Sequence, residues 1–204
     1  MIVTKLTPVT KVKYKVFIDE EFAFVLYKGE LSHYGITEGS VVSDDIIEII
    51  KKEVLQKRAK LRAMHILERA DRTEEELRTK LRQDLYSEDI VECAMQYVKS
   101  FGYIGDKNYA CRFVESRQKS KSKKEIILLL KQKGLSDEVI TEAIESCYEE
   151  VDEKEVIFKL MEKKHFCAKE ASEQEKNKMC AYLLRKGFRY DDIRQLIQVS
   201  SWNA

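Results

Sequence analysis

Glycine and proline are scarce in this chain, which has seven glycines and a single proline among its 204 residues. Turn-rich all-β folds need many of both, so their scarcity argues against that class. The seven glycines form neither a phosphate-binding loop nor a dinucleotide fingerprint, and no G-x-S-x-G or H-E-x-x-H motif occurs. Abundant Glu, Lys, Leu and Ile with few helix breakers predict a mainly helical protein.

Long hydrophobic runs are also missing. No apolar stretch approaches the roughly 20 residues that span a bilayer. Charged residues such as Lys5, Lys11 and Lys13 interrupt the first 25 positions, so we expect no signal peptide and no membrane partner. An apolar content of 44% excludes an intrinsically disordered chain. We therefore expect a cytoplasmic globular protein.

Paired cysteine motifs are absent as well. The five cysteines contain no C-x-x-C pair, and they are Cys93, Cys111, Cys147, Cys167 and Cys180. Such a scattered, odd set predicts free thiols in a reducing compartment. The one close His/Cys pair, His165 and Cys167, has no second pair of ligands beside it. We predict no metal site and no cofactor.

Residues 1–42 have a different pattern from the rest of the chain. Apolar and basic residues alternate over 11–18, a short polar break follows at 19–21, and a second β-prone run covers 22–27. This pattern predicts a β-hairpin, although its turn lacks Gly or Asn. An isolated hairpin is marginal in water, so we expect it to gain a third strand or to pack on a helix.

Helical periodicity begins near Ser43. Asp45 and Glu48 have the spacing of a capping box at the start of an apolar helical pattern that continues to residue 69. An unbroken helix over 45–69 would be about 37 Å long. A break near 51–57 is equally compatible with the pattern, and the sequence leaves the choice open.

An internal repeat organises the remaining chain. Residues 77–98 align with 126–147 at an offset of 49, and a further shift of 53 reveals a third copy. We predict three short helices per copy, at about 57–69, 74–84, 88–100, 106–118, 123–133, 137–148, 153–164, 173–186 and 190–198. The predicted fold is mainly α, with three tandem three-helix modules in an elongated array preceded by the hairpin. The predicted domains are 1–42, 43–104 with its leading helix, 105–151 and 152–204.

Start and stop signals recur in the copies. Thr73, Ser122 and Ser172 each precede a Glu by three residues, which is the spacing of a capping box. The box at Ser172 lies one turn earlier than the others and predicts a longer helix. Gly134 and Gly187 are expected to end the middle helix of their copies in the left-handed conformation. Trp202 is expected to close the last module.

The net charge of +1 conceals strong alternation along the sequence. Residues 57–82 carry +4, residues 112–133 carry +6, residues 137–155 carry −8 and residues 159–194 carry +4. Clustered cations can bind phosphates, although a charge run is often just a solvated face. The acidic block either neutralises the cluster before it or faces a basic partner.

Twelve basic residues are the candidate binding site, chosen for their charge. They are expected to contact a protein partner or DNA: Arg69, Arg72, Arg78, Lys80, Arg112, Arg117, Lys119, Lys121, Lys123, Lys124, Lys131 and Lys133. The tyrosines spread over the helical region, such as Tyr97 and Tyr103, are expected mainly to pack in the modules, with stacking on nucleobases as the alternative.

Three stretches of the sequence together resemble the RecX family. These are the run from Leu67 to Leu81 with its Arg72-Thr73-x-x-Glu76 core, the segment Phe101-Gly102-Tyr103-Ile104-Gly105-Asp106, and the segment from Ile126 to Leu135. The hairpin around 14–24 is similar to the extension of longer members. The chain departs from the family at Gly105, where an Asp is usual, and at Ser122, where a Gly is usual. The second departure questions any role of that glycine in close approach to a partner.

This resemblance implies a regulator of the RecA recombinase that has no catalytic residues. Such proteins bind the groove of the RecA–single-stranded-DNA filament and inhibit its ATPase, strand-exchange and coprotease activities. The implied partners are the RecA filament and, weakly, single-stranded DNA, and we expect a monomer. The alternative is a general nucleic-acid-binding helical repeat protein without a RecA partner. An enzyme is disfavoured, because the acidic pairs Asp44-Asp45 and Asp191-Asp192 lie where the helix dipole alone favours them.

Overall fold

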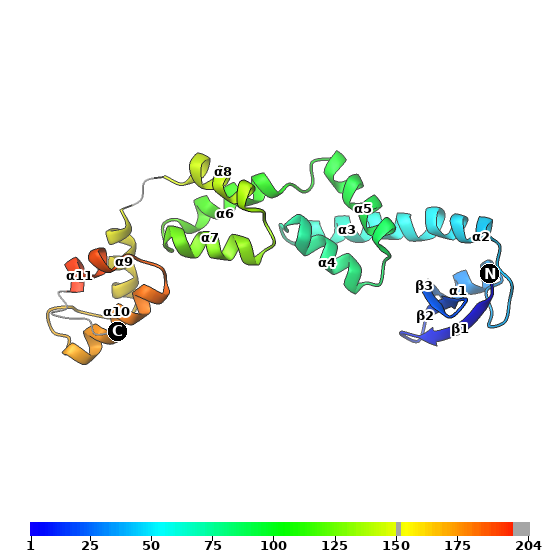
Figure 1. Ribbon diagram of the computed structural model, residues 1–204, viewed down its shortest axis with the longest axis horizontal. Coiled ribbons are helices and arrows are strands. Elements are labelled where there is room, and N and C mark those ends of the chain that lie inside the picture. The colour runs from blue at the N-terminus through cyan, green and yellow to red at the C-terminus, as the bar shows by residue number, and fades with distance from the viewer. Residues whose placement is uncertain (150–151, 198–204) are drawn as a thin grey trace. The chain divides into compact units, whose positions relative to one another are not determined.

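The computed structural model describes residues 1–149 and 152–197, and Trp202 lies outside them (Figure 1). The chain divides into two compact units, the first of residues 1–105 and the second beginning at Asp106. Both are built mainly from short helices, as predicted. Among the described residues, no helix is long and apolar enough to cross a membrane.

The N-terminal segment forms a three-stranded antiparallel sheet of β1 (Val3–Pro8), β2 (Lys13–Ile18) and β3 (Glu21–Tyr27), in that order. The predicted hairpin is β2–β3, and β1 is the third strand that it needed. The two-residue turn at Asp19 and Glu20 has positive φ at both positions, 48° and 72°. That geometry matches a type I′ turn, which usually takes Asn or Gly. Here the Asp19 carboxylate accepts the Ile2 backbone N–H at 2.8 Å, which supports the turn.

Arg58 connects the sheet to the helical part of the first unit. Its guanidinium donates to the Val25 carbonyl at 3.2 Å, forms an ion pair with Glu30 of α1 (Lys28–His33) and lies 4.6 Å from the centre of the Tyr27 ring. One continuous hydrophobic core joins sheet residues such as Leu26 to helical residues such as Ile50. The hairpin therefore packs on the long helix, which the sequence left open.

The helix after Ser43 continues to residue 69 but changes its winding on the way. It consists of α2 (Asp44–Ile49), the π-helical η1 (Ile50–Gln56) and α3 (Lys57–Arg69), with α-region φ and ψ at the junctions. The chain thus has neither a break nor a regular α-helix at 51–57. The capping prediction at Asp45 is wrong, because Ser43 is the N-cap and accepts the Ile46 N–H at 3.4 Å.

The helices of the three modules begin and end within one residue of the predicted positions at the ends that the structure describes. The first contains α3, α4 (Glu74–Gln83) and α5 (Glu88–Ser100). The second contains α6 (Asp106–Arg117), α7 (Lys123–Gln132) and α8 (Asp137–Cys147), and the third contains α9 (Glu153–Lys163), α10 (Glu173–Arg185) and α11 (Tyr190–Ile197). The second and third modules each enclose their own apolar cluster. Short helices need this burial, because they are marginal on their own.

The predicted caps are largely confirmed. Thr73 and Ser172 form complete capping boxes, and α10 is longer than α4 and α7. Ser122 accepts the Glu125 N–H at 3.1 Å, while the Glu125 side chain binds lysines instead of completing the box. Gly134 and Gly187 have φ of 81° and 87° and end α7 and α10 as predicted.

The prediction of free cysteines is wrong for two of them. Cys111 of α6 and Cys147 of α8 form a disulfide with a Cα–Cα distance of 5.5 Å. The two residues lie 36 positions apart, and only the packing of α6 against α8 brings them together. Cys93, Cys167 and Cys180 are free.

Candidate partner-binding surface

The basic cluster of residues 112–133 follows α6, the connector and α7 of the second module. Arg112 and Arg117 lie on α6, Lys119 and Lys121 lie in the connector, and the remaining lysines lie on α7 or directly after it. The exposed members are Arg112, Arg117, Lys119, Lys123, Lys124 and Lys131, whereas Lys121 and Lys133 are half-buried. Most of these cations are therefore exposed to solvent on one module.

Aromatic rings lie against several of these cations. The Arg117 guanidinium is 5.8 Å from the centre of the Phe113 ring. The Lys123 ammonium lies 5.4 Å from the Tyr148 ring, and the Lys133 ammonium lies 5.5 Å from the Tyr109 ring. A ring restrains such a side chain through cation–π attraction without neutralising its charge. These contacts restrain the positions of the three cationic side chains.

Other members of the cluster form ion pairs within the protein. Lys121 pairs with Glu125 at 2.7 Å, and Lys131 pairs with Asp137 of α8 at 2.6 Å. Glu125 also pairs with Lys186 of the third module at 2.8 Å. Lys121 is half-buried in this arrangement, so its contribution to a binding surface is smaller than its sequence position predicts.

The acidic block of residues 137–155 neutralises part of the basic cluster. Asp137 pairs with Lys131 of the cluster, whereas Glu142 pairs with Lys107 of α6, which lies outside the cluster, at 2.7 Å. The Glu153 carboxylate accepts the backbone N–H of Lys123 at 3.4 Å. Internal neutralisation, one of the two alternatives left by the sequence, therefore accounts for some of the acidic residues, while others such as Glu145 are exposed.

The four candidates of the first module differ in their surroundings. Arg78 is only 20% exposed and pairs with Glu74 at 3.3 Å and Glu92 at 3.6 Å, so it stabilises the module. Arg69 ends α3 and lies 3.2 Å from the His65 ring nitrogen. Arg72 and Lys80 are half-buried. These four side chains therefore do not form a continuous exposed cationic surface like that of the second module.

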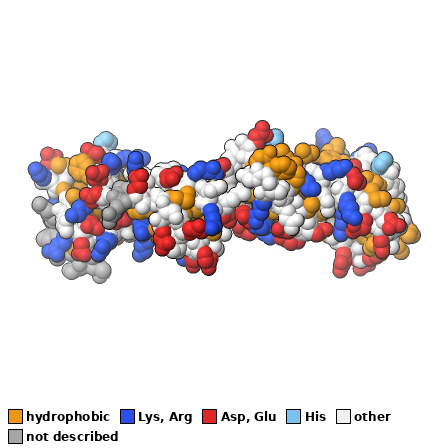
Figure 2. All heavy atoms as spheres, turned by 90° about the horizontal axis from the view of Figure 1, so that it is seen from above, with side chains coloured by type: hydrophobic (Ala, Val, Ile, Leu, Met, Phe, Trp, Pro, Cys, Tyr) orange, Lys and Arg blue, Asp and Glu red, His pale blue; other side chains and the backbone are white. Residues whose placement is uncertain are grey.

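Sequence reasoning missed an apolar surface on the first module. Leu61, Phe101 and Tyr103 are 67%, 56% and 53% exposed. A pocket of about 530 Å³ opens beside them, lined by Leu61, Met64, His65, Leu67, Glu68 and Tyr103. The Phe101 and Tyr103 rings stack 5.6 Å apart at an interplanar angle of 16°. Figure 2 shows hydrophobic side chains gathered in this part of the first unit.

A signal for this surface was present in the sequence. The buried residues of α3 are Ala59, Ala63 and Ile66, which repeat at helical spacing. Leu61 lies outside that stripe, so the same periodicity that predicts the core predicts an exposed leucine. Tyr103, which was expected to pack inside the modules, is exposed instead.

The acidic residues of the described part of the chain do not gather into a candidate metal site. Within 1–149 and 152–197, no group of three or more His, Cys, Asp or Glu side chains could hold a metal ion. Asp44 and Asp45 lie in the first turn of α2, and Asp191 and Asp192 lie in the first turn of α11, as expected for acidic residues at helix starts. The exposed features of the described residues are therefore the cations of the second module and the apolar surface of the first.

Three family models match the chain in sequence order. The first, second and third three-helix domains of RecX match residues 59–97, 106–144 and 152–197. These ranges lie within the three modules and reproduce their order.

Curated relatives match nearly the whole chain. The regulatory protein RecX of Caldanaerobacter subterraneus subsp. tengcongensis is 32% identical, over 92% of this chain and 93% of its own length. That of Clostridium perfringens strain 13 is 30% identical, over 90% of this chain and 87% of its own length.

Solved structures agree in fold. A crystal structure of a regulatory protein RecX is similar with a TM-score of 0.59 and 23% identity, and the match covers 97% of this chain and 98% of the other. The crystal structure of RecX from Lactobacillus salivarius is similar with a TM-score of 0.55 and 27% identity, over 71% of this chain and 95% of the other. With three domain models in order and relatives of about 30% identity along almost its full length, the chain belongs to the RecX family of regulatory proteins.

Proposed function

We propose that this chain regulates the RecA recombinase by binding along the groove of the RecA–single-stranded-DNA filament. It inhibits ATP hydrolysis, strand exchange and coprotease activity there. The observation that carries this proposal is the match of all three family domains in tandem, since a protein with the same modules in the same order is expected to bind the same kind of partner.

The arrangement of the modules supports binding to a repeating partner. Each module has its own three helices, so several modules can each make a weak contact with successive protomers of a filament. Linked weak contacts add through effective concentration, and the total affinity then exceeds that of any single contact. The exposed cations of the second module, such as Lys119 and Lys124, meet phosphate or acidic protein surface in this scheme.

The proposed regulator acts by binding alone. It acts as a monomer in the cytoplasm, without catalysis and without a cofactor. Its net charge of +1 leaves little overall attraction for naked DNA, so single-stranded DNA is contacted weakly and within the filament.

The concentration of exposed cations in the second module favours one other candidate function. A general nucleic-acid-binding protein could use residues 112–133 alone, without any RecA contact. Such a protein binds single-stranded DNA tightly by itself, and its affinity falls steeply with salt because bound phosphates release counterions. A salt dependence near zero for binding to a single-stranded oligonucleotide would exclude this candidate.

The ATPase activity of the cognate RecA on single-stranded DNA tests the proposal. The full chain, titrated to micromolar concentration, should inhibit hydrolysis in a dose-dependent way, and a heat-denatured sample is the control. Undiminished ATPase activity at micromolar protein would dismiss the proposed regulation.

A further inference from the structure

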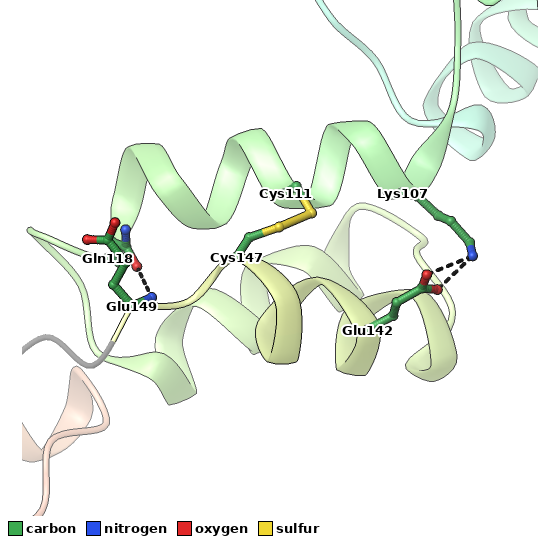
Figure 3. Close-up of a disulfide and its surroundings, with 6 residues drawn as sticks. All are labelled: Lys107, Cys111, Gln118, Glu142, Cys147 and Glu149. Carbon is green, nitrogen blue, oxygen red and sulfur yellow. Dashed lines mark hydrogen bonds and ion pairs between the residues drawn. A yellow bond between two sulfur atoms is a disulfide. The ribbon is translucent and has the colours of Figure 1, made fainter.

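We propose that Cys111 and Cys147 form a reversible thiol–disulfide site, and that its oxidation fastens α8 to α6 and so controls the second module. Cys111 lies in α6, and Cys147 is the last residue of α8. Their Cα atoms are 5.5 Å apart, within the usual range for a disulfide. Both residues are half-buried, and Figure 3 shows their sulfurs bonded between α6 and α8.

The other contacts near this pair are modest. On one side of the disulfide, Lys107 and Glu142 form an ion pair whose side chains are 68% and 54% exposed. Exposed pairs of this kind contribute little to stability. On the other side, the Gln118 side-chain oxygen accepts the Glu149 backbone N–H at 2.9 Å. The disulfide is therefore the strong connection in this part of the α6–α8 contact, and Figure 3 shows it between the two weaker ones.

The apolar packing between the two helices combines alanines with larger aliphatic residues. Ala110 and Val114 of α6 and Ile140, Ala143 and Ile144 of α8 are buried in the same cluster. The alanines bury little area, so Val114, Ile140 and Ile144 supply most of the apolar surface of these helices. A covalent link that closes a segment of 36 positions adds to this packing, because it restricts the unfolded chain.

The pair is connected to the basic surface through its neighbours. Arg112 follows Cys111 directly, and Tyr148, which follows Cys147, lies against Lys123 at 5.4 Å. Separation of the end of α8 from α6 would remove the ring from Lys123 and loosen the backbone beside Arg112. The redox state would then change affinity for the filament, and this link to binding rests on the proposed function.

A peroxide can oxidise the two cysteines to the disulfide, and a dithiol can reduce the disulfide again. One cysteine thiolate attacks the peroxide and breaks its O–O bond, which gives a sulfenic acid and one water after protonation. The second thiol attacks that sulfur, the S–S bond forms and a second water leaves. The two cysteines together lose two electrons and two protons. A dithiol reverses the reaction by thiol–disulfide exchange and becomes a disulfide itself.

The remaining cysteines are placed differently and provide internal controls. Cys180 is buried in the core of the third module, where burial raises the pKa of its thiol. Cys167 is exposed and Cys93 is half-buried, and both are free. A variant with Cys93→Ala, Cys167→Ser and Cys180→Ala keeps the proposed pair alone, so every change in labelling reports on it.

Thiol counting on this full-length variant tests the site. Maleimide labelling should detect two thiols after treatment with a dithiol, none after hydrogen peroxide, and two again after a second dithiol treatment, with a monomer on non-reducing gels. Thiols that stay labelled after peroxide, or that give only intermolecular bridges, would overturn the proposal. Should the triple variant fold poorly, non-reducing digestion of the oxidised wild-type chain should release a peptide pair joined through Cys111 and Cys147, and its absence would count against the site equally.

A second readout separates this proposal from the proposed function. The midpoint of thermal unfolding should be higher in the oxidised form by about 10 °C or more. The oxidised form should bind the filament about three- to tenfold more tightly, while Cys111→Ser should bind equally under both treatments. Equal midpoints would refute the fastening of α8. Normal redox behaviour without any filament binding would instead refute only the proposed function and its link to this site.

Discussion

The Ser122 hydroxyl donates a hydrogen bond to the backbone carbonyl of Lys186 at a distance of 2.6 Å. Ser122 is fully buried and also accepts the Glu125 N–H at the start of α7. A Cβ added to Gly187 would lie 2.9 Å from the Ser122 oxygen. The backbone of the third module thus lies within hydrogen-bond distance of the first residue before α7 in the second module. In this chain the close approach at Ser122 is made by its own third module.

Ser122→Ala should lower the free energy of unfolding by about 2 kcal/mol, since it removes both a helix cap and a buried hydrogen bond. Ser136→Ala is the matched control, because Ser136 caps α8 through the Val139 N–H at an exposed position. That control should lose only about 1 kcal/mol. Urea unfolding of both variants measures the difference, and equal losses would show that the bond to Lys186 contributes nothing.

Gly187→Ala should destabilise the protein by about 2–4 kcal/mol, because a left-handed residue gains a Cβ and this Cβ meets Ser122. Gly187 has φ of 87°, and the new Cβ would also lie 3.1 Å from the Cβ of Lys124. Gly102→Ala is the control with φ of 67° and open space around it. It should lose only about 1 kcal/mol, for the backbone strain alone. Thermal or urea unfolding should rank the two variants in this order, and the reverse order would refute the close approach.

The Glu125 carboxylate should make stability depend on pH in the acidic range. Burial acts to raise its pKa, but the hydrogen bonds from Lys121 and Lys186 outweigh burial and lower the pKa below 4.5. A carboxyl with a depressed folded-state pKa stabilises the fold above its unfolded pKa and loses that contribution as the pH falls through the folded value. The wild-type free energy of unfolding should therefore decline below about pH 4.5 by roughly 1 kcal/mol more than that of Glu125→Gln.

Lys186→Met checks the assignment of that pH dependence. It removes one of the two partners of Glu125, so its pH dependence should fall between those of the wild type and Glu125→Gln. Urea unfolding at a series of pH values measures all three proteins. Identical slopes would mean that the Glu125 pairs do not contribute to stability.

Reversal of charge at Lys119 and Lys124 together should weaken binding to the RecA–single-stranded-DNA filament about tenfold, because both are exposed members of the basic cluster. Their thermal midpoint should change little. Lys5→Glu with Lys11→Glu is the matched control, since these exposed lysines belong to the N-terminal segment and not to the cluster. Fluorescence anisotropy with labelled filaments compares the two double variants. Equal effects would indicate that overall charge, and not the cluster, governs binding.

Much of the helical architecture could be predicted, because the capping residues and the apolar periodicity indicate the same helices. Thr73, Ser122 and Ser172 start helices at the predicted residues, and Gly187 ends α10 with the predicted left-handed conformation. The repeat reinforced each signal, since a cap recognised in one copy supports the equivalent position in another. The first copy departs at Leu85, which takes a φ of 66° where the other copies have Gly. Leucine rarely adopts this left-handed conformation, so the sequence did not reveal that Leu85 is equivalent to Gly134 and Gly187.

Features that depend on tertiary packing were less accessible to sequence reasoning. The π-helical winding of 50–56 follows no recognised motif. The pairing of Cys111 with Cys147 depends on how α6 and α8 pack, and a spacing of 36 residues does not reveal it. In the candidate site, charge alone could not separate Arg78, which is held between Glu74 and Glu92, from exposed cations such as Lys119.

The affinity of the full chain for RecA–single-stranded-DNA filaments, compared with its affinity for the same DNA without RecA, tests the central claim most directly. Both should be measured at physiological salt, because the phosphate contribution depends on ionic strength. Binding to the filament should be at least tenfold tighter than binding to naked DNA. Equal affinities would contradict a filament regulator and favour a general nucleic-acid-binding protein.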